Sequence, residues 1–421
     1  MTPGRRLPGV APPTPHAPAA GSAPAASAEP RHLELDLPGG PVTLGYVEEG
    51  PSCYLAATER SARWPTEVLR AGLATVRVGG VRRGGEARLV LGPEERGRVR
   101  ELFRAKYAPG EFDRYYAGAA RFMRIDLSGA AAEAEGAQAR YRRWVAAEFD
   151  DLAPEYEGQI RGNRISRLLR ERSLALLRPT FGEARRLLEI GCGSGVETLP
   201  MLLDGHEIVC VDLSTAMLEV VRRRARTAGV SERLETRTMA AGELGQLVRE
   251  LGTASFDGAY STYGALNCEE DLAPVARALA ELLPEGRRFV AGAYNRWCLV
   301  ELLGYGLTGQ WGRALGRRRR PIAAGASRYG VDLFAVSPGD LFRSFAPAFR
   351  ATALEAAPAI LPPFDLVKYA EKFARHFATL SRWDARIART RPFSYLGDHF
   401  LAVLERTGAP GTVASAPRRT R

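Results

Sequence analysis

Lysine is almost missing from this chain of 421 residues: it occurs only at positions 106, 368 and 372, although Lys and Arg together number 59. Arginine therefore carries the formal net charge of +11. A bias that runs through the whole sequence is typical of dispersed, solvated arginines, whereas a nucleic-acid-binding face gathers its cations in one patch. We expect no nucleic-acid partner. The one dense run, Arg317–Arg320, could meet an acidic substrate or partner, but we interpret it as a solvated segment.

Paired cysteines and long apolar runs are missing as well. The cysteines at 53, 192, 210, 268 and 298 form neither a Cys-x-x-Cys pair nor a Cys/His cluster, which argues against a zinc site and a disulfide framework. No stretch approaches the roughly 20 apolar residues of a membrane span. The first 30 residues hold Pro and Ala where a secretory signal has an apolar core. These absences predict a cytoplasmic protein without a metal site and without a membrane partner.

The length of the chain favours two domains. Residues 1–30 are rich in Pro, Ala, Gly and Ser, which predicts a disordered tail, and we expect the same of residues 409–421. Between about 31 and 128, short β-branched and apolar runs alternate with turn residues, which predicts a small β-barrel or sheet with one or two helices. The Ala/Glu-rich stretch 129–150 predicts a linker helix.

Residues 151–408 follow a different rhythm, in which strands alternate with helices. This order predicts an α/β domain with a mostly parallel sheet and helices on both faces. The rhythm breaks at about 296–350, which we interpret as an inserted cap, aromatic and apolar in character. Residues 399–407 are expected to form a late strand at an edge of the sheet.

The stretch "LLEIGCGSGVETLP", residues 187–200, predicts a strand that stops at three glycines, Gly191, Gly193 and Gly195. Glycines let the backbone turn sharply and let a ligand lie against bare peptide groups, and the helix that follows offers free N–H groups. Asp212 ends the next strand 21 residues after Gly191, where a carboxylate can accept from ribose hydroxyls. The pattern predicts a nucleoside site beyond the carboxyl ends of these strands.

At this point the sequence resembles a known family. "LLEIGCGSG", "VCVDLSTAMLEVVRRRA" and "FDGAYSTYGALNC" resemble three motifs of the class I S-adenosylmethionine (SAM)-dependent methyltransferases. The resemblance covers about 150–407 and implies a Rossmann-like fold with a seven-stranded, mostly parallel sheet whose last pair is antiparallel. It also implies an enzyme that transfers a methyl group from SAM to a small organic acceptor, with oxygen or nitrogen as the favoured acceptor atom.

The resemblance further implies which residues meet the cofactor. Asp212 would hold the ribose hydroxyls. Many members have Asp where this chain has Ala240, so a hydrogen bond to the adenine amine is either missing or supplied by backbone. The residues assigned to the cofactor in this way are Tyr156, Glu189, Gly191, Cys192, Gly193, Gly195, Asp212, Leu213, Met217, Ala240, Ala241 and Ser261.

Catalytic candidates are few. An oxygen or nitrogen acceptor calls for a base, and His399 follows Asp398, which could orient its ring. His376 is the other histidine considered, and Tyr263 would lie near the methyl donor. For each of them a purely structural role remains the alternative.

The stretch from about 33 to 126 resembles the split β-barrel family, which includes flavin-binding pyridoxamine-phosphate oxidases and deazaflavin-dependent nitroreductases. This resemblance implies an FMN or F420 site, with cations at Arg63, Arg70, Arg77 and Lys106 near the phosphate. Two further uses of the barrel stay open: homodimerisation and substrate presentation. The chain could accordingly be a bifunctional redox methyltransferase, or a SAM-binding protein without catalysis.

The ribose assignment predicts the effect of one substitution. Asp212→Ala is expected to weaken SAM binding by about 1–3 kcal/mol, because a buried, charge-assisted hydrogen bond is lost. Isothermal titration calorimetry measures the change, and an unaltered affinity would remove Asp212 from the cofactor site.

Overall fold

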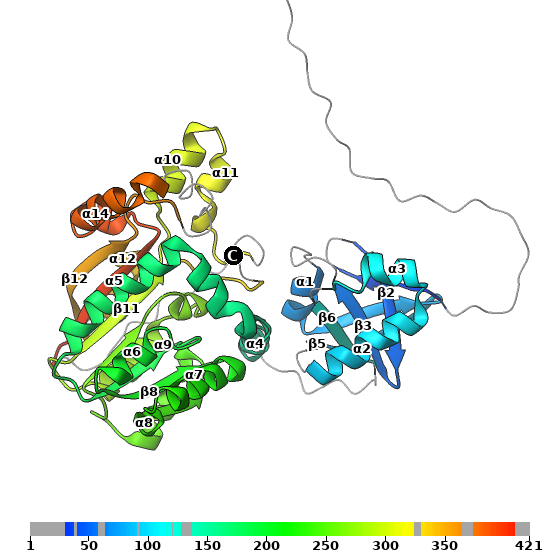
Figure 1. Ribbon diagram of the computed structural model, residues 1–421, viewed down its shortest axis with the longest axis horizontal. Coiled ribbons are helices and arrows are strands. Elements are labelled where there is room, and N and C mark those ends of the chain that lie inside the picture. Colours follow the sequence, from blue (N-terminus) through cyan, green and yellow to red (C-terminus); the bar gives the residue numbers. More distant parts are fainter. Residues whose placement is uncertain are drawn as a thin grey trace, which may run out of the picture.

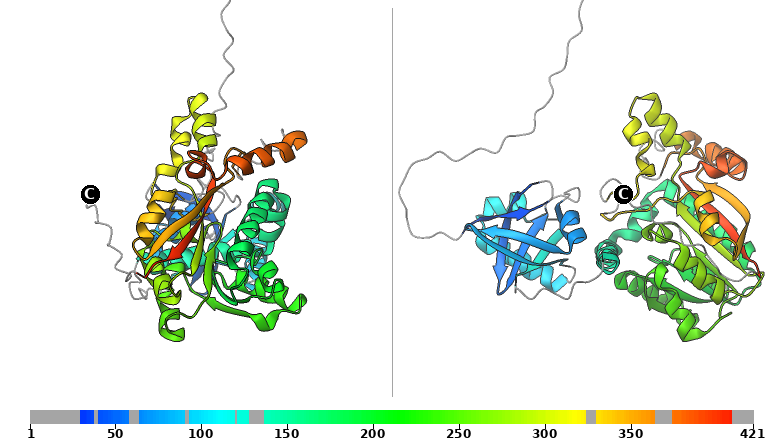
Figure 2. Two further views of the ribbon diagram at one scale, coloured as in Figure 1. Left: turned by 90° about the vertical axis from the view of Figure 1, so that its left-hand side faces the viewer. Right: turned by 180° about the vertical axis from the view of Figure 1, so that it is seen from behind.

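A computed structural model describes residues 30–37, 40–57, 64–90, 93–119, 121–127, 137–323, 330–363 and 374–408. The predicted disordered tails lie outside these residues, apart from Pro30. Figure 1 shows two domains beside each other, a small β domain and a larger α/β domain, with the helix α4 between them. The view from behind in Figure 2 gives the same arrangement.

The small domain is a closed antiparallel barrel with the strand order β1-β2-β3-β6-β5-β4. Closure by the β1–β4 pairing leaves no open sheet edge, which removes a common route to aggregation. Its strands are β1 (His32–Asp36), β2 (Val42–Glu49), β3 (Ser52–Ala57), β4 (Leu73–Val78), β5 (Val81–Leu89) and β6 (Arg121–Asp126). Its helices are α1 (Trp64–Ala71), α2 (Pro93–Lys106) and α3 (Pro109–Tyr115). The predicted β-barrel is thereby confirmed, whereas its membership of the split-barrel family and its use as a dimer interface stay predictions.

The larger domain contains a seven-stranded sheet with the order β12-β13-β11-β10-β7-β8-β9. Its strands are β7 (Arg186–Ile190), β8 (Glu207–Asp212), β9 (Leu234–Thr238), β10 (Gly258–Ser261), β11 (Arg288–Tyr294), β12 (Phe349–Ala357) and β13 (His399–Arg406). Only β13 runs antiparallel to its neighbours. The predicted seven-stranded, mostly parallel sheet is therefore confirmed.

The predicted position of residues 399–407 at a sheet edge is wrong. The corresponding strand, β13, lies between β11 and β12, and its first six residues are all buried. A strand covered on both faces reads as a continuous apolar run, and "FLAVL" is such a run. The edge is formed by β12, over whose residues no strand was predicted.

Helices cover both faces of this sheet (Figure 1). Those of the alternating pattern are α5 (Arg164–Phe181), α6 (Thr198–Leu203), α7 (Thr215–Thr227), α8 (Gly245–Leu251), α9 (Ala273–Leu282) and α12 (Pro338–Phe345). The predicted cap region contains α10 (Leu299–Leu307) and α11 (Trp311–Ala314), and a second excursion between β12 and β13 contains α14 (Phe377–Ile387). In both figures these cap helices project from the same end of the domain.

The helix α4 (Ala137–Gly162) runs across the boundary that we predicted at residue 150. Asp150 accepts hydrogen bonds from Ser214 Oγ (2.5 Å) and from the Ala216 N–H (2.9 Å), so α4 caps the first turn of α7. On its other side, Trp144 and Val145 share one apolar cluster with barrel residues such as Val68. α4 therefore fixes the barrel to the larger domain.

A buried ion pair strengthens this junction. Arg121 of β6 donates to Glu148 of α4 (Nη2–Oε1, 2.9 Å), and the same carboxylate oxygen accepts from the Gly330 N–H (2.8 Å). Both side chains of the pair are almost fully buried. Such a pair is costly to break, because the remaining charge is left without its partner in a dry environment.

Arg121→Ala is therefore expected to destabilise the protein by about 3–5 kcal/mol, since Glu148 stays buried. Urea unfolding followed by circular dichroism measures the change. The matched control is Arg104→Ala, which removes an exposed pair with Glu101 and is expected to cost less than about 1 kcal/mol. Equal effects of the two substitutions would contradict a structural role for the buried pair.

Candidate active site

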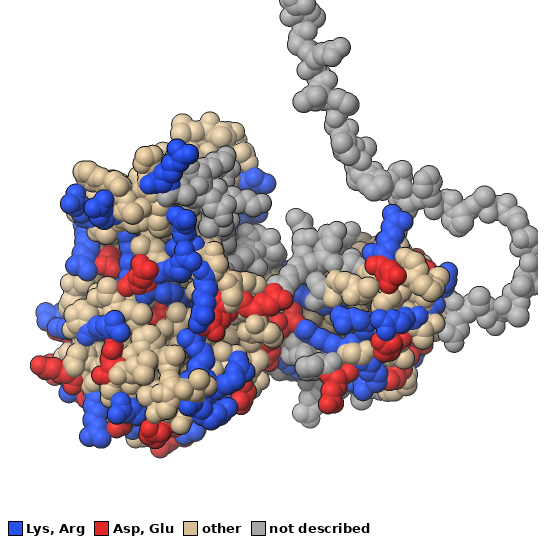
Figure 3. Space-filling model, viewed as in Figure 1, with Lys and Arg blue, Asp and Glu red and all other residues tan. Residues whose placement is uncertain are grey.

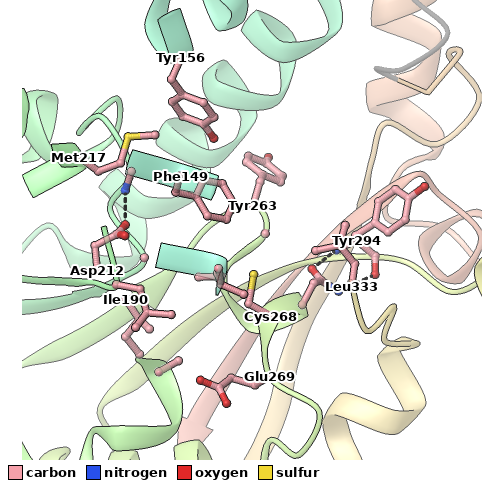
Figure 4. Close-up of a pocket in the computed structure, with 18 of the residues that line it drawn as sticks. Phe149, Tyr156, Ile190, Asp212, Met217, Tyr263, Cys268, Glu269, Tyr294 and Leu333 are labelled. Carbon is pink, nitrogen blue, oxygen red and sulfur yellow. Dashed lines mark hydrogen bonds between the residues drawn. The ribbon is translucent and has the colours of Figure 1, made fainter. Parts of the chain in front are cut away.

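A cavity of about 1230 Å³, open mouth included, lies beyond the carboxyl ends of β7, β8 and β10. Open parallel sheets place their ligand pockets at this edge. The walls come from the glycine-containing loop after β7, the ends of neighbouring strands, α4, α5 and the segment around Leu333. Figure 4 shows the side chains from these elements converging on the cavity.

The loop after β7 needs its glycines for two physical reasons. Gly191, Gly193 and Gly195 have φ angles of +73°, +51° and +73°, a region that other residues rarely adopt. In addition, a Cβ on Gly191 would come within 2.1 Å of the Ala265 Cβ. Bare backbone is therefore what faces the cavity at residues 191 and 193.

Asp212 ties the two neighbouring strand ends together. Its Oδ2 accepts from the Gly193 N–H (2.8 Å), drawn as a dashed line in Figure 4, and its Oδ1 accepts from the Ser214 N–H (2.9 Å). Burial raises the pKa of Asp212, whereas these two backbone hydrogen bonds oppose the rise. The carboxylate borders the cavity and has lone pairs beyond those that the two amides use.

The structure brings most of the predicted site residues together around this one cavity. Those that line it are Tyr156, Gly191, Gly193, Asp212, Leu213, Met217, Ala240, Ala241, Tyr263 and His399. These residues are far apart in the sequence. They meet because most of them follow parallel strands that end at the same edge of the sheet.

Four predicted cofactor residues do not line the cavity: Glu189, Cys192, Gly195 and Ser261. Gly195 packs towards Val221 of α7, and Cys192 and Ser261 are buried. The Glu189 carboxylate accepts from Thr198 Oγ1 (2.5 Å) and from the Tyr260 hydroxyl (3.0 Å). A resemblance in sequence transfers the position of a residue but not the direction of its side chain.

His399 lies between two tyrosines at the cavity wall. Its ring makes edge contacts with Tyr263 and Tyr294, with centroid distances of 5.3 and 5.2 Å. The expected neighbour is in place, because His399 Nδ1 lies 3.1 Å from Asp398 Oδ2. A carboxylate can only accept, so the proton in this hydrogen bond belongs to Nδ1, and Nε2 is left as the acceptor of a neutral ring.

The interpretation of Arg317 as a solvated residue is wrong. Its guanidinium is buried and donates to Glu301 Oε2 (2.7 Å), to Asp398 Oδ1 (2.6 Å) and to the Asp398 carbonyl (2.8 Å). It also lies 4.0 Å from the Tyr294 ring centroid. Burial alone would raise the pKa of Asp398, but Arg317 and His399 hold it well below the ordinary value. Arg317 is buried whereas Arg318 is exposed. The run of four arginines contains no signal that indicates which of them is buried.

The Cys298, Glu301 and Asp398 side chains also stand close enough together to suggest a metal site. The guanidinium of Arg317 occupies the space between the two carboxylates, as the distances above show. This cluster is therefore an ion-pair network with a cation of its own.

Several lining residues were missed by the sequence reasoning. Glu269 follows the short helix η3 (Ala265–Cys268) and accepts from the Gly242 N–H (2.8 Å). Arg170 of α5 pairs with Glu197 (2.8 Å) and lies 5.1 Å from the Tyr263 ring centroid. No local motif marks either residue, because each reaches the cavity through tertiary packing. The other missed lining residues include Val145, Phe149, Cys268, Tyr294 and Leu333.

The barrel cations proposed for a flavin phosphate have other partners. Arg70 pairs with Asp332 and Arg77 with Glu34 (2.8 Å), and the Lys106 ammonium lies 3.5 Å from the Tyr46 ring centroid. Arg63 lies outside the described residues. The three described cations belong to α1, β4 and α2, and an FMN or F420 site in the barrel stays a prediction.

Residues 187–286 match the family model of a methyltransferase domain. The matched segment of this domain begins at β7 and ends before β11, so it contains the glycine loop, Asp212 and Glu269. The match confirms the prediction of a methyltransferase domain in this part of the chain.

Two curated relatives align with parts of the methyltransferase domain. A demethylmenaquinone methyltransferase of Beutenbergia cavernae is 31% identical over 150 residues, which are 35% of this chain and 57% of that protein. An 18S rRNA (guanine-N(7))-methyltransferase of Arabidopsis thaliana is 41% identical over 78 residues, 18% of this chain and 27% of that protein. The chain therefore spans about a quarter to just over half of the length of these relatives.

Solved structures give weaker likenesses. The geranyl diphosphate C-methyltransferase of Streptomyces coelicolor A3(2) is 14% identical with a TM-score of 0.37, covering 56% of this chain and 79% of that one. A SAM-dependent methyltransferase of Mesorhizobium loti is 19% identical with a TM-score of 0.36, covering 56% and 98%. TM-scores this low do not indicate which reaction a protein catalyses.

The buried Glu189 predicts a pH dependence of stability. Burial raises its pKa to about 7, whereas the unfolded chain has the model-compound value of 4.5. A carboxyl whose pKa is raised by folding stabilises the protein fully below about pH 4.5, and this contribution is lost as the pH rises through about 7.

The free energy of unfolding, measured by urea titration, is therefore expected to fall by a few kcal/mol between pH 5 and pH 8 relative to Glu189→Gln, which cannot ionise. Identical pH profiles for the wild type and the variant would mean that Glu189 ionises as freely in the folded protein as in the unfolded chain.

Proposed function

We propose that this protein methylates a hydroxyl or amine of a small organic acceptor with SAM as the methyl donor. The observation that carries the proposal is one cavity with two chemically different ends. One end has bare peptide groups and a carboxylate, at Gly191, Gly193 and Asp212. The other end has a histidine whose ring is oriented by a buried carboxylate, His399 with Asp398.

The first end suits the adenosyl part of SAM. The spare lone pairs of Asp212 would accept from the ribose hydroxyls, and Leu213 and Met217 offer apolar contact for the adenine. Tyr156, whose ring lies against Gly193, would cover the methionine part. In Figure 4, Met217 and Asp212 lie one above the other on the left, with Tyr156 above them and Tyr294 on the right.

We also propose an acceptor for the adenine amine, which Ala240 cannot provide. Glu269 borders the cavity beside Ala240 and Ala241. One of its oxygens, Oε1, accepts from the Gly242 N–H, and the other, Oε2, lies 4.0 Å from Arg142 Nη2 and has further lone pairs for a ligand donor. Burial raises the pKa of Glu269, and the hydrogen bond from Gly242 and the nearby Arg142 oppose the rise. The carboxylate would thus replace the family's Asp from a different part of the chain.

The second end suits the acceptor. Methyl transfer from a sulfonium is an in-line displacement with a neutral leaving group, so the enzyme mainly has to align acceptor, methyl and sulfur. Tyr263 and Tyr294 flank His399 and provide flat, apolar walls for that alignment. As the acceptor atom attacks the methyl carbon, His399 Nε2 would accept its proton, and Asp398 would stabilise the resulting imidazolium.

An acceptor is found by incubating the protein with isotope-labelled SAM and fractionated cell extract, and by following the product through its mass shift. With that fraction, His399→Gln is expected to lower kcat by about 10²–10⁴-fold, because general base catalysis contributes on this scale. The affinity for S-adenosylhomocysteine is expected to stay unchanged, since His399 lies at the other end of the cavity. A variant with full activity would remove His399 as the base.

Glu269→Gln tests the adenine contact. Its amide still accepts one hydrogen bond but loses the charge, so S-adenosylhomocysteine is expected to bind about tenfold more weakly, the scale of one charge-assisted hydrogen bond. The analogue S-inosylhomocysteine has a carbonyl in place of the amine and provides the control. The wild type should prefer the amine strongly and the variant only slightly, by calorimetry. A preference that survives the substitution would contradict the assignment.

A further inference from the structure

An exposed apolar surface lies on the cap of the methyltransferase domain. It consists of the exposed side chains of α10, α11, residues 315–320 and α14, and we call it the cap surface. Leu307 is 87% exposed, Trp311 61% and Trp383 55%. Trp and Leu side chains that are this exposed occur at few other places in the described residues, and they include Leu203 and Leu73.

The helix α10 combines an apolar sequence with an exposed position. Its sequence "LVELLGYGL" is apolar at almost every position, yet none of its residues is buried. Apolar surface in water is unfavourable in proportion to its area, and contiguous exposed patches mark interaction sites in soluble proteins. The helix therefore has the composition of an element that is covered in the working state.

The exposed charge of the cap surface has one sign. In residues 299–323 and 374–391 the acids are Glu301 and Asp384. Glu301 pairs with Arg317, and Asp384 is fully buried and pairs with Arg172 (2.7 Å). The arginines exposed on the cap surface are Arg313, Arg318, Arg319, Arg320, Arg382 and Arg386.

α10, α11 and α14 project from the same end of the domain (Figures 1 and 2). In Figure 3 the end formed by α10 and α11 is mostly tan, with blue side chains at its margins. Apolar tips surrounded by cations are the arrangement that an amphipathic element presents to a lipid headgroup layer.

From these observations we propose that the cap surface docks on an anionic lipid bilayer. Trp311 and Trp383 would sit at the headgroup level, where Trp is enriched, and Leu303 and Leu307 would enter the acyl boundary. The arginines would meet the negative charge of the lipids. A symmetric contact between two copies is disfavoured, because it would place like charges opposite each other.

The prediction of no membrane partner rested on the lack of a spanning segment. Among the residues that the structure describes, no helix indeed has the length and apolarity of a span. Docking in the plane of the headgroups does not require one.

Sedimentation with vesicles tests the proposal on the full-length protein, without SAM or acceptor, so the result is independent of the methyl-transfer assignment. We expect binding to vesicles of phosphatidylcholine and phosphatidylglycerol in equal parts, and much weaker binding to phosphatidylcholine alone. High salt should weaken the binding to the anionic vesicles, because it screens the charge of the arginines. The double substitution Leu307→Ser and Trp311→Ser should reduce it about tenfold or more, since the buried apolar area sets the affinity.

Leu203→Ser and Leu73→Ser are matched controls, because they remove equally exposed leucines from α6 and from the barrel. They should leave vesicle binding unchanged, and melting curves of all variants exclude unfolding. The proposal fails if the wild type sediments with neither kind of vesicle, or if the control substitutions weaken binding as much as the cap substitutions. It also fails if the cap substitutions abolish a concentration-dependent dimer, or RNA binding, in a protein that ignores vesicles.

Discussion

The hydrogen bond from the Gly193 N–H to Asp212 is the contact on which the site depends. It joins the loop after β7 to the end of β8, and it requires the left-handed backbone that glycine supplies at residues 191, 193 and 195. Once the loop is held in this way, the peptide groups and the carboxylate face the same cavity. Every role proposed for the surrounding side chains assumes that the loop after β7 and the end of β8 are held in this arrangement.

The helix α4 connects the barrel to this site. Asp150 caps α7, Glu148 receives Arg121 of the barrel, and Val145 lines the cavity. The segment around Leu333 is held from the barrel side as well, because Asp332 pairs with Arg70 and its carbonyl accepts from Tyr141 (2.8 Å). One physical role of the barrel is therefore to support one wall of the cavity. This role needs no cofactor in the barrel.

The parts of the site that could be predicted are those encoded in local pattern. The glycine loop and Asp212 stand at fixed spacing around two neighbouring strands, so sequence reasoning places them together. Glu269 could not be predicted, because it reaches the cavity only through the packing of η3 against the loop after β9. In the fold, the alternation of strands and helices predicted the sheet. The interior position of β13 depends on which strands lie beside it, and short-range periodicity does not contain that information.

The four consecutive arginines 317–320 lie in different environments although they are identical residues. The first is enclosed between Glu301 and Asp398 and thereby connects the cap to the histidine at the cavity, whereas the next three point outward. A survey of natural variants should accordingly find exchanges to lysine or glutamine tolerated at the three outward positions. At position 317 it should find that replacement is accompanied by loss of the neighbouring acids, because two carboxylates would otherwise be left facing each other in a dry interior.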